Sequence, residues 1–349
     1  MPTRNRARNT RARNTRTVCA AVTTVAAVAA LVSPAGNQPT AANASIRANG
    51  ATRDGAPPIV RLVVGATQTM HAPRQRVRQA TFAYGTDPAQ RFDTYWPTGS
   101  VESASAASTA SAGAGAASLP GILILHGGYW LAGDKSTWRS IARRLAARGY
   151  VVFAANYRLS PRAPWPAQLD DAAAALGYIR THARRFRLDP SRMVVLGSSA
   201  GGQLATMLGA TGGGRHLRGV VALSPVNAPY QAYVDGGRAD ASALQRKLRR
   251  AITKLVRCAP AGADTAACLF RLAHATPQVT AGAAPMLFVH SRGDFVPPKQ
   301  SAAVRDALAL AGVSADLKDV PGAAHGGGLL RTRPVYTMVA RWIDAVTSS

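Results

Sequence analysis

The stretch MVVLGSSAG, residues 193–201, decides the fold of this chain. Four apolar residues predict a buried strand, and the following QLATML at 203–208 predicts a helix. Gly-x-Ser-x-Gly between a strand and a helix is typical of a sharp turn with Ser199 at its apex. The helix directs its free N–H groups and the positive end of its dipole at that apex, which favours negative charge there. Ser199 is therefore a candidate nucleophile, and the alternative is a plain Gly/Ser loop in a chain with 32 glycines.

Strands and helices alternate from residue 121 onwards. Alternation of this kind predicts a mostly parallel sheet with helices on both faces, an α/β fold. The predicted strands are 122–125, 151–155, 193–196, 219–223, 286–290 and 315–320. The predicted helices are 137–148, 169–184, one that starts at 200, 299–311 and 334–346. Shorter strand-like runs precede them at 59–64, 78–84 and 91–95, the last of which should stop at Trp96-Pro97.

Composition divides the rest of the chain into segments. Residues 36–58 are rich in Asn, Ala, Thr, Pro and Gly, and we predict a disordered spacer there. Residues 99–118 are almost entirely Ser, Ala and Gly, which favours a low-complexity loop within one domain that covers 59–349. Residues 226–284 interrupt the alternation with a basic amphipathic helix at 242–257, and we expect a helical lid or rim over the site.

A serine hydroxyl needs a base, and the base needs an orienting group. His325 and Asp294 each lie in a loop directly after a predicted strand. With Ser199 they would meet at the carboxyl edge of a parallel sheet. Taken alone, Asp294 is more typical of a turn and His325 of a solvated loop. The chain order Ser, Asp, His, however, is that of α/β-hydrolases. We therefore predict a triad of Ser199, Asp294 and His325.

The loop HGGYW at 126–130 follows the predicted strand 122–125. Successive glycines let backbone N–H groups face a substrate oxygen, where each donor can lower the barrier by about 3–4 kcal/mol. We predict that the N–H groups of Gly128, Tyr129 and Ala200 form an oxyanion hole. His126 is expected to be a structural hydrogen-bonding residue, because His325 already supplies the base. The scattered histidines have no spacing that indicates a metal site, and the sequence implies no cofactor.

The N-terminus has the layout of a secretory signal peptide. Six arginines lie between Arg4 and Arg16, an uncharged apolar run covers 18–32, and Ser33-Pro34-Ala35 offers a cleavage site after Ala35. The run is too short to span a bilayer comfortably, so an uncleaved anchor is the weaker alternative. We expect an exported protein, periplasmic or secreted, with no stable membrane insertion once residues 1–35 are removed.

The formal charge of +26 has two explanations. A basic surface can attract nucleic acid or anionic surfaces, or arginine-rich composition can spread over a solvated protein. The arginines after residue 50 are scattered, with no basic and aromatic pattern and no nucleic-acid module. We therefore expect no specific nucleic-acid partner.

Two of the three cysteines would remain after signal cleavage. Cys258 and Cys268 are ten residues apart, and an even number in an exported protein favours a disulfide. Such a loop would stabilise the fold by about 3 kcal/mol. The alternative is a pair of buried free thiols. A zinc site is not expected, because no further pair of metal ligands lies near these cysteines in the sequence.

These motifs resemble the hormone-sensitive-lipase-like branch and the acetyl-xylan and feruloyl-esterase-like branch of the α/β-hydrolase superfamily. The resemblance rests on HGGYW, GDK at 133–135, YRLSP at 157–161, GSSAGG at 197–202 and RGDFVP at 292–297. It covers most of residues 80–345 and implies a carboxylesterase acting on small-molecule or polysaccharide-linked esters. Two positions depart from the pattern. Tyr129 replaces the usual third glycine, a form similar to that of kynurenine formamidases, and Arg162 stands where these esterases often have Glu.

Two alternatives follow. The Tyr129-Trp130 pair favours an arylformamidase, although an export signal argues against a role in cytoplasmic tryptophan breakdown. The other alternative is a non-catalytic binding protein with a basic working surface, which the complete set of triad residues argues against.

Overall fold

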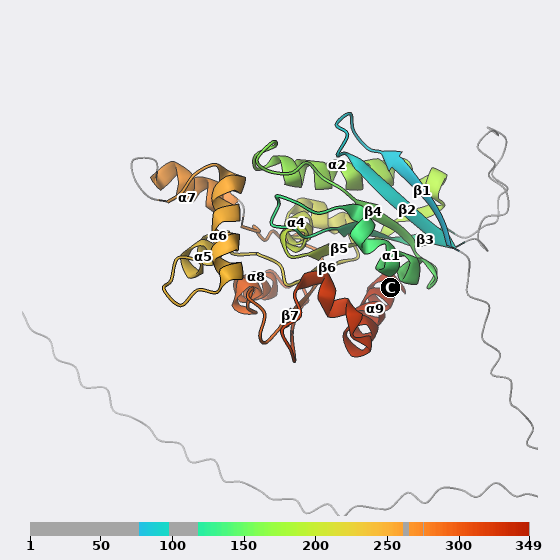
Figure 1. Ribbon diagram of the computed structural model, residues 1–349. Helices are drawn as coiled ribbons and strands as arrows, with labels where there is room; N and C mark the ends of the chain where they lie inside the picture. The colour runs from blue at the N-terminus through green and yellow to red at the C-terminus, as the bar shows by residue number, and fades with distance from the viewer. Residues whose placement is uncertain (1–76, 98–117, 261–264, 275, 349) are drawn as a thin grey trace, which may run out of the picture. The chain divides into compact units, whose positions relative to one another are not determined.

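A computed structural model describes residues 77–97, 118–260, 265–274 and 276–348, and its strands form one mixed sheet (Figure 1). The strand order is β1-β2-β4-β3-β5-β6-β7-β8. The bounds are β1 Val77–Ala83, β2 Arg91–Pro97, β3 Leu119–Leu125, β4 Val151–Ala155, β5 Leu188–Ser198, β6 Gly219–Leu223, β7 Met286–Ser291 and β8 Ala315–Val320. Strands β1 and β2 pair antiparallel, β2 pairs antiparallel with β4, and all other pairs are parallel. The predicted mostly parallel α/β fold is confirmed.

The order of the strands fixes where a site can form. From β3 the chain crosses to β4 on one side, and the next strand, β5, lies on the other side of β3. Sheets of this kind open a crevice at the carboxyl ends of the two strands where the direction of winding reverses. The 126–130 loop leaves the end of β3, and Ser199 follows the end of β5. The topology therefore brings these two motifs together.

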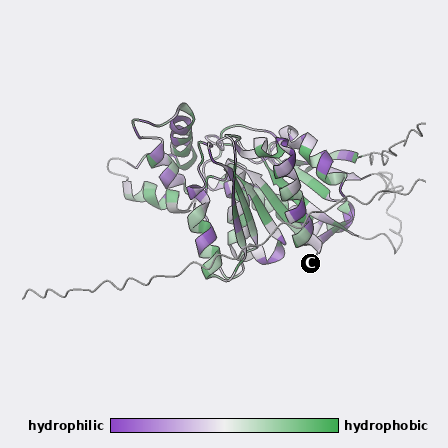
Figure 2. Cartoon of the chain, turned by 90° about the horizontal axis from the view of Figure 1, so that it is seen from below, coloured by the Kyte–Doolittle hydropathy of each residue, from purple (hydrophilic) through white to green (hydrophobic). Residues whose placement is uncertain are grey.

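Helices cover both faces of the sheet, because the strands are apolar on both sides. In β5, the side chains of Val194 and Leu196 lie on one face of the sheet, and those of Met193 and Val195 lie on the other. The first face is covered by α1 Arg139–Ala146 and α9 Arg333–Ser348, and the second by α2 Ala167–Thr181, α3 Ala183–Phe186, α4 Ala200–Ala210 and α8 Lys299–Leu310. Figure 2 shows the hydrophobic strands between helices that carry many of the hydrophilic residues.

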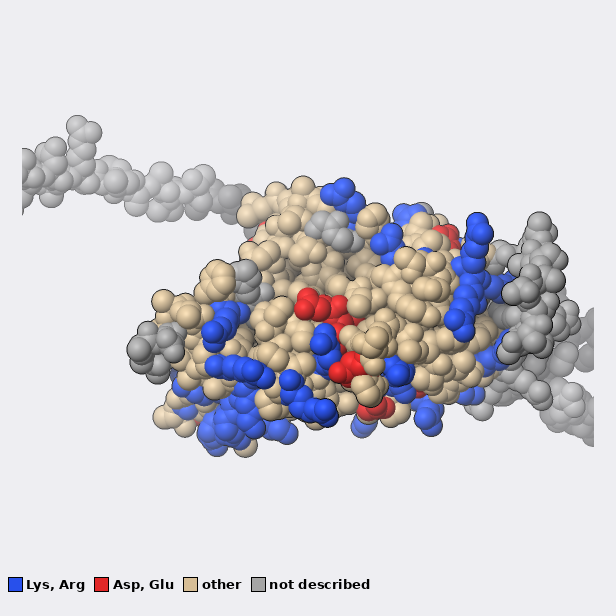
Figure 3. Space-filling view, turned by 90° about the horizontal axis from the view of Figure 1, so that it is seen from above, with Lys and Arg blue, Asp and Glu red and all other residues tan. Residues whose placement is uncertain are grey.

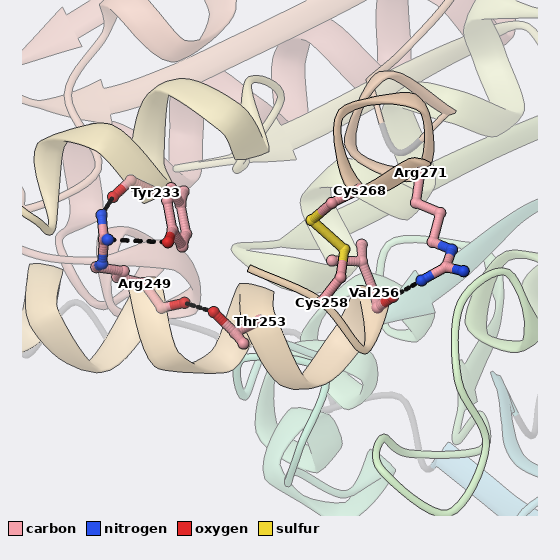
Figure 4. The surroundings of a disulfide bond; sticks show 7 residues. All are labelled: Tyr233, Arg249, Thr253, Val256, Cys258, Cys268 and Arg271. Carbon is pink, nitrogen blue, oxygen red and sulfur yellow. Dashed lines mark hydrogen bonds between the residues drawn. A yellow bond between two sulfur atoms is a disulfide. The ribbon is translucent and has the colours of Figure 1, made fainter. Parts of the chain in front are cut away.

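The segment between β6 and β7 holds three helices, α5 Pro229–Asp235, α6 Ala243–Val256 and α7 Thr265–His274. A capping box of Ser242 and Gln245 starts α6. Its apolar side contributes Leu248, Ile252 and Leu255 to a core shared with residues of the 126–130 loop and α4. The predicted disulfide is confirmed, because Cys258 is bonded to Cys268 with a Cα–Cα distance of 5.6 Å, and it joins the end of α6 to α7 (Figure 4).

Some boundaries differ from the prediction. The predicted helix 137–148 is a 3-10 turn, η2 Lys135–Trp138, followed by α1, because Asp134 caps the chain and starts the helical segment two residues earlier than expected. The predicted helix 169–184 is divided into α2 and α3, which are separated by His182. Strand β2 does not stop before Trp96 but continues to Pro97, opposite Val77, where a strand end tolerates the missing N–H.

Several predictions lie outside the described residues. These are the signal peptide, the 36–58 spacer, the strand at 59–64 and nearly all of the 99–118 loop. Within the ranges that are described, no helix is both long enough and apolar enough to cross a membrane.

Candidate active site

Ser199 occupies a strained turn between β5 and α4. Its backbone lies at φ 54° and ψ −115°, a conformation that costs a non-glycine residue about 1–3 kcal/mol. The turn is fixed because Ser199 N donates to Leu223 O at 2.8 Å, and the side chain is buried. Gly201 permits the close approach of the next loop, since a Cβ there would lie 2.3 Å from the carbonyl oxygens of both Leu125 and His126. The fold therefore holds Ser199 where the strain is balanced by packing.

His325 and Asp294 contact each other. Nδ1 of His325 lies 2.8 Å from Oδ1 and 2.9 Å from Oδ2 of Asp294. The carboxylate is buried and also accepts a hydrogen bond from Val296 N at 3.1 Å, so its orientation is fixed. With Nδ1 directed at the carboxylate, Nε2 of the imidazole is left for another partner. The ring of Phe295 lies 4.3 Å from the His325 ring, centroid to centroid.

Ser199 lies beside His325 without a hydrogen bond to it. A Cβ built on Gly326 would be 3.8 Å from Ser199 Cβ, which places the serine against the residue that follows the histidine. Within the described ranges, no hydrogen bond joins Ser199 Oγ to the imidazole. Catalytic hydrogen bonds are often long in a protein without substrate and tighten when substrate binds. The three predicted residues thus come together at the ends of β5, β7 and β8.

Three further serines hold the loop that carries His325, and the sequence analysis did not identify them. Gly327 N donates to Ser198 Oγ at 2.9 Å, and Gly326 N donates to Ser224 Oγ at 3.0 Å. Ser291 Oγ donates to Ala324 O at 2.7 Å. The signal in the sequence is the position of each serine at the end of a parallel strand, where its side chain reaches the next loop along the edge.

The predicted oxyanion loop is sharply bent. Gly128, Tyr129 and Trp130 have φ angles of 129°, 61° and 59°. The bend is closed by Ala132 N, which donates to Gly128 O at 3.0 Å, and is anchored where Trp130 Nε1 donates to Gln203 Oε1 at 3.0 Å. Within the described part of the chain, the N–H groups of Gly128, Tyr129 and Ala200 donate to no other protein group.

His126 lies behind this loop. It is buried, its Nδ1 is 2.8 Å from Gly127 O, and its ring stacks on Tyr157 at 4.4 Å between centroids. Tyr157 Oη donates to His126 O at 2.8 Å. Burial lowers the pKa of His126, so the imidazole is neutral at pH 7. These contacts support the loop and leave His126 away from proton transfer.

The residues that the structure describes contain no group of three His, Cys, Asp or Glu side chains placed to hold a metal ion. The arrangement at the sheet edge combines a strained serine, a histidine oriented by a buried carboxylate, and N–H groups without a protein acceptor among the described residues. This is the arrangement of a serine hydrolase of the α/β-hydrolase class.

Comparison with known proteins identifies the family. The BD-FAE family model matches residues 111–308, and the chain belongs to this family of feruloyl-esterase-like hydrolases. Esterase LipC of Mycobacterium tuberculosis is 27% identical over 290 residues, which cover 79% of this chain and 67% of LipC. Carboxylesterase NlhH of the same organism is 38% identical over 91 residues, which cover 26% of this chain and only 28% of NlhH.

Solved structures agree on the fold. Esterase B from Lactobacillus rhamnosis superposes with a TM-score of 0.60 at 20% identity, covering 79% of this chain and 87% of that one. A truncated carbohydrate esterase from gut microbiota superposes with a TM-score of 0.61 at 22% identity, covering 80% of this chain and 99% of that one. The chain is a carboxylesterase-type hydrolase, of the class that cleaves carboxylic esters.

Proposed function

We propose that this protein hydrolyses carboxylic esters through Ser199, His325 and Asp294. His325 Nε2 takes the proton of Ser199 Oγ as the oxygen attacks the ester carbonyl. As the tetrahedral intermediate collapses, the imidazolium gives that proton to the leaving alkoxide oxygen, the alcohol departs, and an acyl-serine remains. Water then repeats the attack with His325 as the base, which releases the acid and restores Ser199. Asp294 holds the Nδ1–H tautomer and stabilises the imidazolium that forms in each half. The contact of 2.8 Å between His325 and Asp294, beside the strained Ser199, is the observation that carries this proposal.

In this proposal the negative oxygen of each tetrahedral intermediate is bound by the N–H groups of Gly128, Tyr129 and Ala200. The Ala200 N–H is the first of α4, so the positive end of the helix dipole adds to the stabilisation. Because the bent loop is already fixed by the bond between Trp130 and Gln203, the donors need little reorganisation when charge develops.

The test is covalent labelling by a fluorophosphonate together with hydrolysis of short 4-nitrophenyl esters. We expect the native protein to be labelled at Ser199, and Ser199→Ala to lose labelling and at least about 10³-fold of kcat. Ser191→Ala is the matched control, because Ser191 is an exposed serine at the opposite end of the same strand. It should keep full activity. An unlabelled native protein, or a Ser199→Ala variant that still turns over esters, contradicts the mechanism.

An amide substrate of the arylformamidase type is the second candidate. It is favoured by the Tyr129-Trp130 sequence and by the stacking of Tyr129 on Phe295, 6.2 Å between centroids, which gives the site an aromatic wall. Parallel assays of 4-nitrophenyl acetate and N-formylkynurenine separate the two candidates. We expect the ester to have the larger kcat/KM.

A carbohydrate-linked ester is among the substrates that we propose. The support is the family match and two structural neighbours, one described as a carbohydrate esterase and the other as a bifunctional GH43-CE protein from Bacteroides eggerthii. Release of acetate or a phenolic acid from a decorated polysaccharide is the corresponding assay.

A further inference from the structure

A lysine of the inserted helices lies at the active-site loops. Nζ of Lys247, on α6, is 4.7 Å from the centroid of the Tyr129 ring. The Tyr129 ring stacks on Phe295, and Phe295 contacts the ring of His325. Two aromatic rings therefore separate a cation on the insertion from the proposed catalytic base.

The ammonium group of Lys247 is available to a ligand. Its side chain is exposed, and no carboxylate pairs with it among the residues that the structure describes. The contact with Tyr129 is made to a ring face, which leaves N–H donors of the ammonium free for hydrogen bonds. The nearest acidic residues in the sequence are already paired, since Asp235 binds Lys299 and Asp240 binds Arg238.

The surroundings add positive charge and contain no acidic residue on the same helix. The sequence of α6 has no Asp or Glu, and its other exposed cations are Arg246, Arg250 and Lys254. Figure 3 shows Lys and Arg side chains gathered at the end of the domain that holds α5 to α7, on the left as in Figure 1. An excess of positive charge on a surface raises the local concentration of anionic ligands near it.

Helix α6 is held firmly against the site. Ser160 Oγ donates to Lys254 O at 2.9 Å, and Trp165 N donates to Leu255 O at 3.1 Å. At the other side, Arg249 donates two hydrogen bonds to Tyr233, one to its carbonyl at 2.6 Å and one to its hydroxyl at 2.8 Å (Figure 4). The position of Lys247 relative to Tyr129 is thus set by the fold.

We propose that Lys247 selects esters that carry a carboxylate beyond the scissile bond, on the acyl or the alcohol part. This inference rests on the proposed esterase function of Ser199. The carboxylate pairs with the ammonium group while Tyr129 and Phe295 line the path to His325. A neutral ester of the same length reaches the serine without this contact, so the charge acts mainly through KM.

Two matched pairs of substrates test the inference. The first pair is the mono-4-nitrophenyl ester of adipic acid and its methyl-capped counterpart, which differ by one charge on the acyl part. The second is 4-acetoxybenzoate and methyl 4-acetoxybenzoate, which differ on the alcohol part. We expect the native protein to prefer the charged member of at least one pair by about five- to tenfold in kcat/KM. The preference should shrink as salt is raised from 0.01 to 1 M, because the Debye length falls from about 30 to 3 Å.

The decisive variant is Lys247→Glu, which should lower the ratio of kcat/KM for charged over neutral ester by at least about tenfold. Lys247→Arg should restore most of the ratio. The control is Arg184→Glu, which makes the same change of charge at an exposed position on α3, at the opposite edge of the sheet. It should leave the ratio unchanged.

The outcomes separate the two proposals. If the native protein hydrolyses the neutral esters but neither pair shows a preference that Lys247→Glu reduces, the role of Lys247 is wrong and the esterase function stands. If the neutral esters are not hydrolysed and Ser199 is not labelled, the esterase function itself fails.

Discussion

Single residues at this sheet edge are held in conformations that their neighbours impose. Ser199 and the three residues 128–130 all have positive φ angles, and three of these four are not glycine. Such strain persists only where packing and hydrogen bonds over-determine the geometry. Here the bonds from Ser199 to Leu223 and from Trp130 to Gln203 do so. The N–H groups of the proposed oxyanion hole are therefore in position before any substrate arrives.

Alanine substitutions at Gly128 and Gly149 distinguish a loss of stability caused by backbone strain from a loss of catalysis. Both have large positive φ angles, 129° and 100°, so alanine at either position is strained. At Gly128 a Cβ would also lie 1.9 Å from Ala132 O, whereas nothing lies within 4 Å at Gly149. We expect Gly128→Ala to lower kcat for 4-nitrophenyl acetate by about 10²-fold, because the N–H donors shift. Gly149→Ala should cost stability alone, and equal losses of kcat in the two variants would contradict the role of the loop.

At the scale of elements, the sequence predicted what local patterns encode. Ser199, the loop of Asp294 and the HGG loop each follow an apolar run, and the loop of His325 follows the predicted strand 315–320. Their places at strand ends could therefore be predicted from residue order alone. The structure brings Asp294 and His325 into contact as expected. Ser198, Ser224 and Ser291 also lie at strand ends, but residue order does not show which loop their side chains bind, because their partners lie far away in the sequence.

The contact between Lys247 and Tyr129 could not be predicted from local sequence patterns either. The amphipathic pattern of α6 predicted which side of the helix is buried. It did not predict which loop that side contacts, because the contact depends on how the insertion packs on the sheet. The division of the predicted helix 137–148 into η2 and α1 also depends on contacts that residue order does not show. Asp134 could be recognised as a cap only once its bonds to Ser136 and Asn156 were known.

Asp134 makes the stability of the η2 turn depend on pH. Burial disfavours its ionised form, but hydrogen bonds from Ser136 and Asn156 outweigh that effect and lower its pKa to about 2. A folded pKa below the unfolded value near 4 means that the stabilisation is complete above about pH 4 and is lost as the pH falls towards 2. Asp134→Asn should therefore lower the free energy of unfolding by about 1–2 kcal/mol at pH 7, and the difference should vanish near pH 2.

Urea unfolding of the two proteins between pH 2 and 7 measures this difference. Asp306→Asn is the control, because Asp306 is exposed and, among the residues that the structure describes, pairs only with the neighbouring Arg305. A difference for Asp134→Asn that does not change with pH would contradict the assignment.

For the whole molecule, we propose export through residues 1–35. The Arg-rich start, the apolar run and the small residues before Gly36 support it, and the disulfide between Cys258 and Cys268 suits an oxidising compartment. Expression of the full chain in a bacterium, followed by fractionation and N-terminal sequencing, should give periplasmic or secreted protein that begins at Gly36. Recovery of the uncleaved chain from the cytoplasm would contradict export.

The attachment of α6 has a consequence for the kind of ester that this protein meets. A helix bonded through its backbone to Ser160 and Trp165, and continued by a disulfide, cannot swing away as a unit without breaking those bonds. We expect α6 to keep its position during turnover, so that no opening step at a lipid–water interface is needed. We therefore expect rates on dissolved esters that do not rise sharply when the same ester forms droplets.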